Sequence, residues 1–300
     1  MSHAPVKIGV RGSRLGLSIG QETAEALRPH VGHAAIEFVP IPDPPRRANP
    51  AWPGAALERA LLHGEVDAVI QNAKDLSPAP PAGIQLAAVT QRFTPFDVLI
   101  ALEEQILDEL PDGAALSAHT PLRRAQLLHY RGDLRIVDFA GSLDERIRML
   151  ERGDVDGLVV SAAAVEHLGL QDRVTEIFTT AVLVPAPGQG MTAVQVRAGS
   201  RDLLKAAKHL DDATARAEFD TERAFLRELK ADFSAPVGAL ASNEGGALRL
   251  EGVIVDREGR RLFRDVETGA PGDEEQIGAR LAQRLLAEGA RSALAPSGGR

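Results

Sequence analysis

Short apolar runs alternate with helical patterns along the first 72 residues, and this alternation limits the possible folds more than any other feature. The run "VKIGVR" favours a strand, and the apolar spacing of "RLGLSIGQETAEALRPH" favours a helix that stops near Pro29. "AAIEFVPIP" favours a second strand, "GAALERALLHGEV" a second helix and "VDAVI" a third strand. This β-α-β-α-β order predicts a parallel sheet with helices on both faces.

The same alternation restarts after "QRFTPFDVLIAL" and predicts a second α/β unit. The segment "LVPAPGQGMTAVQVRAG", residues 183–199, interrupts it with a Pro- and Gly-rich turn and one more strand. From about residue 208 the pattern changes to a long amphipathic helix, a hairpin that turns at residues 257–259 and a final helix. This last part predicts a small α+β domain.

Composition excludes several classes of function. The chain has a net charge of -8 and only 4% aromatic residues, which argues against nucleic acid as a partner. The sequence has no apolar run of about 18 residues and no leader-like start, so we expect a cytoplasmic protein without membrane contact. Because it has no cysteine and its eight histidines are scattered, we expect neither thiolate chemistry nor a metal site.

Lys74 and Asp75 follow the third predicted strand and precede a Pro-rich loop. The carboxyl ends of parallel strands are where open α/β sheets present their ligands. One interpretation is a solvated surface ion pair, which is common at strand ends. The other is a partly desolvated carboxylate suited to proton transfer.

Two predicted helix starts carry features of anion sites. Arg11 and Ser13 lie at a strand-to-helix turn, where free N–H groups favour an anion, although Ser13 could simply cap the helix. In "HTPLRRAQ", Thr120 is the expected cap, and Arg123 and Arg124 fall in the first turn. Positive charge there opposes the helix dipole, so the two arginines indicate an anionic ligand.

Two further residues have both a functional and a structural interpretation. Arg146, in "LDERIRML", either adds to the anion site or pairs with an acid on the helix surface. Gln189, in "PAPGQG", either points into a cleft or faces solvent in a turn. Taken with Asp75, these arginines predict a cleft between two α/β lobes that binds a small polycarboxylate and assists it by acid/base chemistry.

The chain resembles the porphobilinogen deaminase family, also called the hydroxymethylbilane synthases, over nearly its whole length. Seven segments occur in the family's order and spacing: "IGVRGSRLGL", "GEVDAVIQNAKDLS", "PLRRAQLL", "GDVDGLVVSAAAVEHLGLQDRV", "LVPAPGQG", "TERAFLREL" and "APVGA". The resemblance implies an α/β fold of two periplasmic-binding-protein-like (type 2) lobes plus a C-terminal α+β domain. The domains expected are residues 1–92 with 187–207 for the first lobe, 93–186 for the second lobe and 208–300 for the C-terminal domain.

The resemblance also implies a reaction. Family enzymes join four porphobilinogen molecules head to tail; each step protonates an aminomethyl group, expels ammonia and lets the growing chain attack the azafulvenium. The carboxylate that manages these protons corresponds to Asp75, with Lys74 as its neighbour. The positions that hold acetate and propionate groups correspond to Arg11, Ser13, Arg123, Arg124 and Arg146, and the turn glutamine to Gln189.

The chain departs from the family at the site of its cofactor. Family members hold a dipyrromethane primer through a cysteine thioether, and Phe233 stands at that position. The adjacent Ser234 is a far poorer nucleophile than a thiolate, so no covalent dipyrromethane is expected. Further departures are Gln71-Asn72, Ala140, Glu166-His167 and the stretch "PDPPRRANPAWPG" in place of a basic lid. Lost arginines weaken the binding of a long anionic chain more than that of one ring.

The resemblance and these departures together imply a transferase of tetrapyrrole biosynthesis that deaminates porphobilinogen, or a similar aminomethylpyrrole, to an azafulvenium captured by a nucleophile without the usual covalent dipyrromethane. The alternative is a non-catalytic paralogue that binds pyrrole carboxylates or has a regulatory role. Both hypotheses expect small pyrrole carboxylates as ligands, a monomer, and no nucleic acid or membrane as partner.

Overall fold

The computed structural model describes residues 4–32, 35–42, 52–77, 79–139, 141–231 and 233–294. The chain divides into two compact units. The first contains residues 1–93 and 190–216, and the second contains residues 94–189 and 217–300. Ala140 and most of the stretch "PDPPRRANPAWPG" lie outside the described residues.

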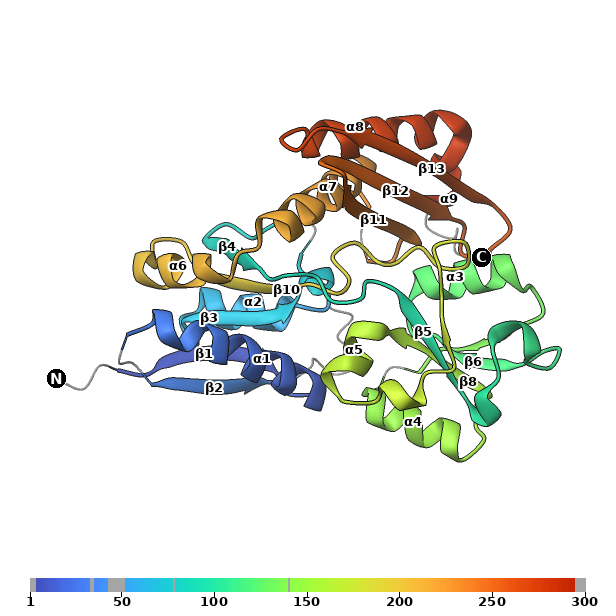
Figure 1. The fold of residues 1–300 in the computed structure, drawn as a ribbon, viewed down its shortest axis with the longest axis horizontal. Helices are drawn as coiled ribbons and strands as arrows, with labels where there is room; N and C mark the ends of the chain where they lie inside the picture. The colour runs from blue at the N-terminus through green and yellow to red at the C-terminus, as the bar shows by residue number, and fades with distance from the viewer. Residues whose placement is uncertain are drawn as a thin grey trace. The chain divides into compact units, whose positions relative to one another are not determined.

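The first unit is an α/β lobe around a five-stranded sheet (Figure 1). Its strands are β1 (Val6–Arg11), β2 (Ile36–Ile41), β3 (Ala68–Asn72), β4 (Ile84–Val89) and β10 (Thr192–Arg197), in the order β2-β1-β3-β10-β4. Strands β2, β1 and β3 are parallel, as predicted, but β10 is antiparallel to both of its neighbours. The predicted parallel sheet is therefore mixed, because the chain re-enters the lobe after residue 190 and runs against β3.

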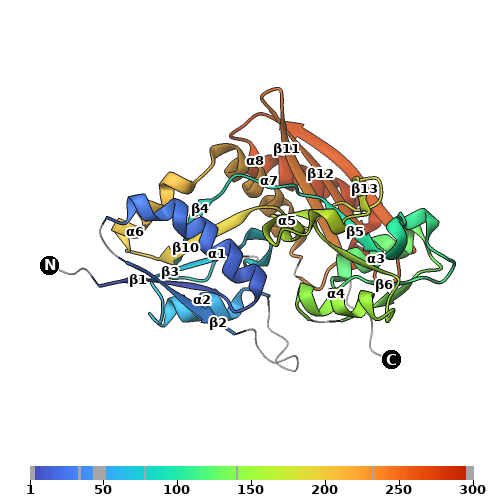
Figure 2. The ribbon, with the colours of Figure 1, turned by 60° about the horizontal axis from the view of Figure 1, so that its bottom comes forward.

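Helices cover both faces of this sheet, since alternate residues of a strand point to opposite sides. On one face, Ile8 and Ile70 pack with Ile19 of α1 (Arg14–Leu27) in a core that also reaches α6 (Arg201–Ala207). Figure 2 shows α1 along the strands. On the other face, Val69 packs with α2 (Ala55–Leu62). Short 3-10 turns cover Arg28–His30, Ala73–Asp75 and Lys208–Leu210.

The second unit begins with an α/β lobe of the same design. Its strands are β5 (Asp97–Ala101), β6 (Ala115–Ser117), β7 (Arg135–Val137), β8 (Gly157–Ser161) and β9 (Glu176–Ile177), in the order β7-β6-β8-β5-β9. The three strands β7, β6 and β8 are parallel, and β5 is antiparallel to β8 and β9. The helices are α3 (Pro121–Tyr130), α4 (Leu143–Glu151) and α5 (Ala162–His167), and 3-10 turns cover Leu102–Glu104, Leu107–Glu109 and Gln171–Arg173.

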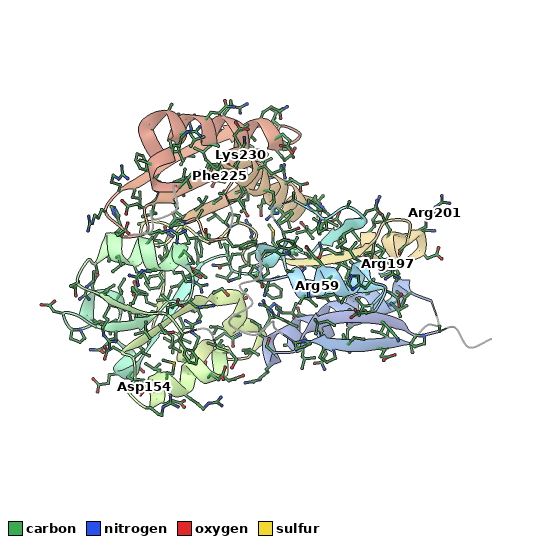
Figure 3. The ribbon with its side chains drawn as sticks, turned by 180° about the vertical axis from the view of Figure 1, so that it is seen from behind. Arg59, Asp154, Arg197, Arg201, Phe225 and Lys230 are labelled. Atoms are coloured by element: carbon green, nitrogen blue, oxygen red, sulfur yellow. The ribbon has the colours of Figure 1, made fainter. Side chains whose placement is uncertain are left out.

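The C-terminal domain packs helices against a three-stranded antiparallel sheet. Its elements are α7 (Ala213–Leu229), β11 (Val237–Glu244), β12 (Ala247–Val255), β13 (Leu262–Gly269), α8 (Glu274–Leu285), a π-helical turn (Leu286–Ala290) and α9 (Arg291–Leu294). The predicted hairpin is β12-β13, whereas β11 was not anticipated. Phe225 of α7, labelled in Figure 3, is fully buried, and a Cβ on Gly252 of β12 would lie 2.8 Å from its ring. The predicted final helix is interrupted at Gly289, whose φ is 102°.

The predicted fold class is confirmed: two α/β lobes, each around a five-stranded sheet, and a C-terminal α+β domain. The predicted domain limits remain a prediction, since the compact units group the C-terminal sheet with the second lobe and divide α7 after residue 216. Within the part of the chain that the structure describes, no helix is long and apolar enough to cross a membrane.

Candidate functional site

Asp75 lies in the 3-10 turn that directly follows β3, at the end of an apolar strand buried between two helical layers. Its Oδ2 atom is 3.3 Å from Nη1 of Arg11, the last residue of the neighbouring parallel strand β1. The side chains of Arg11 and Asp75 are 30% and 14% exposed. This ion pair is therefore neither fully solvated nor sealed, and Lys74 lies half-buried in the same turn.

The segment that enters α2 holds this pair in place. Nη2 of Arg11 donates to the carbonyl of Pro53 at 3.0 Å, and the N–H of Gly54 donates to the carbonyl of Asp75, also at 3.0 Å. A Cβ on Gly54 would lie 2.7 Å from that carbonyl oxygen and 2.3 Å from Oε1 of Gln71. Only glycine lets the backbone at position 54 lie this close to the Asp75 carbonyl, so the Asp75 turn requires glycine here.

Ser13 is the N-cap of α1: its Oγ accepts the N–H of Gly16 at 3.1 Å. The capping interpretation of Ser13 is therefore correct, and its binding role remains a prediction. A small pocket in this lobe places Ser13 near the ion pair. The pocket is lined by Arg11, Ser13, Leu15, Gly16, Ile19, Ile70, Gln71, Asn72 and Asp75.

In the second unit, Arg123 meets a carboxylate of the protein itself. Thr120 caps α3, as predicted, and its Oγ1 accepts the N–H of Arg123 at 3.2 Å. Nε and Nη2 of Arg123 donate to the two oxygens of Asp97 at 3.1 and 2.7 Å. Both side chains are buried, with exposures of 7% and 3%. The counter-ion expected from a ligand is thus supplied at least in part by Asp97, and substrate binding by Arg123 remains a prediction.

Gln189 belongs to the same buried group. Its Nε2 donates to Oδ1 of Asp97 and to the carbonyl of Pro95, both at 2.8 Å, and the residue is 1% exposed. Gly188 and Gly190, with φ of 79° and 82°, form the turn around it, a conformation that glycine adopts without strain. The solvent-facing interpretation of Gln189 is therefore wrong, because Asp97 and Pro95 satisfy its amide inside the protein.

Glu222 of α7 fixes this turn from the C-terminal domain. Its buried carboxylate accepts the N–H of Gly188 at 2.6 Å and that of Ala241 in β11 at 2.8 Å. The sequence shows Glu222 only as part of a helical pattern, so nothing in the spacing marks this role. One signal was present for Asp97, a charged residue at the start of an unbroken apolar strand.

Arg146 of α4 is buried and bonded to the protein, so the expectation of a partner on the helix surface is wrong. Its Nε donates to Oγ of Ser117 at 3.1 Å, and its Nη2 donates to the carbonyls of Ser117 and Val159 at 2.7 and 2.9 Å. Burial, together with the charge of Arg123, lowers the pKa of Arg146 to about 9, while Asp97 acts in the opposite direction. Arg146 therefore stays charged at neutral pH.

Arg124 differs from its neighbour Arg123. It is exposed on α3, and its side chain has no ion-pair or hydrogen-bond partner among the described residues. The residues predicted to form one site thus fall into two groups. Arg11, Ser13, Lys74 and Asp75 lie in the first unit, while Arg123, Arg124, Arg146, Gln189 and Phe233 lie in the second. Their convergence on one cleft remains a prediction.

Phe233 is half-buried in the turn before β11. The neighbouring Ser234 is exposed, and its Oγ accepts a hydrogen bond from Nη2 of Arg257 at 3.2 Å. The sequence contains no cysteine, so no thioether can form at this turn or elsewhere in the chain. The residues present do not fit a dipyrromethane held through sulfur. Among the described residues, no group of three or more His, Asp or Glu side chains could hold a metal ion.

Comparison with known proteins identifies the family. The model described as "Porphobilinogen deaminase, dipyromethane cofactor binding domain" matches residues 51–205, and that of the "Porphobilinogen deaminase, C-terminal domain" matches residues 217–287. A porphobilinogen deaminase of Pelotomaculum thermopropionicum is 41% identical, covering 78% of this chain and 75% of that protein. One of Desulforudis audaxviator is 38% identical and covers 97% of both.

A solved structure, the periplasmic VFT2 domain of BvgS from Bordetella pertussis, is 16% identical with a TM-score of 0.44, covering 68% of this chain and 85% of that domain. The family matches favour the predicted enzyme over the non-catalytic alternative. Two family models together span more than half of the chain, and close relatives cover nearly all of it. The chain therefore belongs to the porphobilinogen deaminase family of transferases.

Proposed function

We propose that this protein deaminates porphobilinogen, or a similar aminomethylpyrrole, with Asp75 as the group that handles the proton. The observation that carries the proposal is the partly exposed Asp75 carboxylate beside Arg11 in a pocket at the carboxyl end of β3. A carboxylate in such a place is within reach of a small ligand and is held in one orientation. Family membership supplies the substrate class, since the relatives carry the name porphobilinogen deaminase.

The proposed reaction balances without an added oxidant or reductant. The aminomethyl group leaves as ammonia from its protonated form, and the C–N bonding pair departs with the nitrogen. The pyrrole nitrogen donates its electron pair into the ring, which forms an azafulvenium cation. The carboxylate of Asp75 stabilises the positive charge that develops at the ring N–H, an effect that is stronger in a pocket than in water. It then accepts the proton that the nucleophile loses when it bonds to the exocyclic carbon of the azafulvenium.

Ligand carboxylates need cations that can change partners. Arg11 has one contact with Asp75 at 3.3 Å, and the exposed Arg124 has no partner among the described residues. We propose that Arg11 and Arg124 bind carboxylates directly, with Lys74 as a further positive charge near Asp75. Arg123, Arg146 and Gln189 contribute more by fixing the protein groups that they contact than by direct binding, because their bonds go to Asp97 and Ser117.

We propose that the azafulvenium is captured by a nucleophile that is not attached to the protein through sulfur. The absence of cysteine supports this step. The nucleophile is then either a pyrrole primer bound without a covalent link or a second small molecule. The cytoplasmic location and the monomeric state inferred from the sequence belong to this proposal.

Ammonia release from porphobilinogen tests the function. Wild-type protein should release ammonia, and Asp75→Ala should lose about 100-fold or more of the rate, the usual contribution of a positioned proton-transfer group. Asp67→Ala is the matched control, because it removes a carboxylate from the opposite end of β3, where Asp67 pairs with Arg197 outside the pocket. No release above the level of Asp75→Ala would contradict the proposal.

Intact-mass spectrometry of the purified protein tests the untethered nucleophile separately. We expect the mass of the bare polypeptide. An excess equal to two pyrrole units would overturn this part of the proposal and leave the deaminase activity standing.

A further inference from the structure

Glu58 of α2 is a buried carboxylate, 1% exposed, whose hydrogen-bond partners among the described residues are all neutral. Nε1 of Trp52 donates to its Oε2 at 2.8 Å, and Nε2 of Gln195 donates to its Oε1 at 2.9 Å. The amide N–H and the hydroxyl of Ser77 lie 3.4 and 3.3 Å from Oε1. No Lys or Arg among the described residues forms an ion pair with this carboxylate. Within the described part of the chain, hydrogen bonds from neutral groups hold it.

This carboxylate sets the direction of a chain of amides. Gln195 donates its Nε2 to a carboxylate oxygen of Glu58, so its NH2 group faces Glu58. The carbonyl oxygen of Gln195 then faces the other way, and it accepts Nε2 of Gln71 at 2.8 Å. Because the NH2 group of Gln71 donates to Gln195, the carbonyl oxygen of Gln71, Oε1, is the last group in this series of amides. Glu58 therefore determines that Gln71 ends in an acceptor and not in a donor.

Oε1 of Gln71 is an acceptor without a donor in the described protein. Gln71 is 6% exposed, lines the pocket that contains Asp75, and packs its Oε1 against Gly54. No hydrogen bond to this oxygen comes from the described residues, and the atom is not sealed from solvent. Polar atoms of well-buried residues are nearly always paired, so such an oxygen needs a donor from water or from a ligand.

We infer that Gln71 is a specificity-determining residue whose Oε1, aligned by Glu58 through Gln195, accepts a hydrogen bond from an N–H group of the ligand next to Asp75. This inference rests on the proposed function, which places an aminomethylpyrrole in that pocket. Such a ligand offers two N–H sources, the ring nitrogen and the aminomethyl ammonium. The inference names the shared chemistry, an N–H donor, and the test separates the two.

The single tryptophan makes the test specific to this site. Trp52 is the only Trp in the chain, and its indole N–H donates to Glu58, so its fluorescence reports on the network. Three probes are compared by stopped-flow mixing, which records binding before turnover. They are porphobilinogen, its furan analogue, which lacks the ring N–H, and its methyl analogue, which lacks the amine.

Gln71→Met removes the acceptor and keeps the length of the side chain. We expect it to weaken porphobilinogen binding about tenfold, the value of one hydrogen bond, and to leave the binding of one analogue unchanged. The unaffected analogue identifies the N–H that Gln71 accepts. If Gln71→Met weakens all three probes equally, or none, the inference is overturned. If wild-type protein binds none of the probes, the proposed function falls as well.

Glu58→Gln tests the alignment of the amides by calorimetry. Glutamine can offer either end of its amide, so Gln71 loses its fixed direction and porphobilinogen binding should weaken by a similar factor. The double variant with Gln71→Met should bind no more weakly than Gln71→Met alone. If the fold-loss in porphobilinogen affinity of the double variant equals the product of the two single losses, Glu58 and Gln71 act independently. Glu58 would then act only through stability, and its positioning role would be overturned.

Gln126→Met is the matched control. Gln126 is also a buried, hydrogen-bonded glutamine, paired with both backbone groups of Val184 in the other unit. It should lower the melting temperature without changing the ratio of porphobilinogen to analogue binding. If this binding ratio changed in Gln126→Met, the ratio would depend on the stability of the protein and would not report on Gln71.

Discussion

The two units each contain an Arg–Asp pair, and the two pairs differ in almost every physical respect. Arg11 and Asp75 make one contact at 3.3 Å between side chains that are 30% and 14% exposed. Arg123 and Asp97 make two contacts, the shorter at 2.7 Å, between side chains that are 7% and 3% exposed. The first pair is open and the second is closed.

The difference follows from what surrounds each carboxylate. Asp97 also accepts Nε2 of Gln189, so its oxygens are occupied by donors inside the protein. Asp75 lies in a turn that lines a pocket, and Arg11 donates both to Asp75 and to the carbonyl of Pro53. An open pair can exchange its partner for a ligand at small cost, whereas breaking a closed pair leaves a buried charge. The comparison assigns chemistry to the open pair and structure to the closed one.

The largest effect should come from breaking the closed pair. Asp97→Ala leaves Arg123 buried without its counter-ion and close enough to Arg146 for the two charges to repel, as the lowered pKa of Arg146 indicates. We expect the free energy of unfolding of the second unit to fall by about 3–5 kcal/mol. Urea denaturation followed by circular dichroism measures the loss.

Asp75→Ala is the matched variant in the open pair. It should cost less than about 1 kcal/mol of stability, because Arg11 keeps its bond to Pro53 and gains solvent. Equal losses in the two variants would break the distinction between open and closed pairs.

The next largest effect is a rescue. In Asp97→Asn the bidentate charge pair is lost, and Arg123→Gln alone leaves Asp97 as a buried anion. The double variant contains neither charge, so we expect it to recover about 2 kcal/mol relative to the sum of the single losses. A double-mutant cycle in urea measures this coupling. Additive losses would mean that the two side chains do not act as a pair.

Sequence patterns predicted most of the fold because each pattern depends on local spacing. The helix after Thr120 and the hairpin around Gly259 were predicted from the capping residue and the turn residues, and both are present. The antiparallel direction of β10 and the existence of β11 depend on which distant strand each one meets. Local spacing carries no information about such long-range pairing.

The candidate site was predicted in part. Asp75 at the end of β3 followed from the strand pattern, but its pairing with Arg11 joins residues 64 positions apart. Arg123 and Arg124 are adjacent and of one type, so the sequence treats them alike. A helix turns by about 100° per residue, which buries one against Asp97 and exposes the other. The residues missed, Asp97, Glu58 and Glu222, are charged groups at the start of an apolar strand or within a helical pattern.

A smaller effect should separate these two neighbouring arginines. Arg124→Gln removes an exposed side chain without a partner in the described protein, so stability should change by less than about 0.5 kcal/mol. If Arg124 binds a substrate carboxylate, KM for porphobilinogen should rise about five- to tenfold, and the effect should shrink as salt is added. Arg148→Gln, on the next helix, is the surface control. A rise in KM for Arg148→Gln of the same size would show that only net charge matters.

The smallest effect concerns a third pair, Arg131 and Asp133, which lies at the surface of the second unit. Asp133 accepts two hydrogen bonds, one from Nη2 of Arg131 at 2.7 Å and one from the N–H of Gly113 at 2.9 Å. These bonds lower the pKa of Asp133 to about 2. A carboxyl whose pKa is lower in the folded state adds stability above its ordinary pKa near 3.8, and this stability is lost as the pH falls toward 2.

Asp133→Asn should therefore be less stable than wild type at pH 5 and 6, and the difference should shrink at pH 3. Asp112→Asn is the control, because Asp112 is fully exposed and 3.9 Å from Arg131. Urea denaturation at the three pH values measures the difference, which should be small since salt and water screen a surface pair. A difference that stays constant down to pH 3 would mean that Asp133 acts through the Gly113 turn as a neutral acceptor, and a surface pair would then differ from the closed pair in kind as well as in degree.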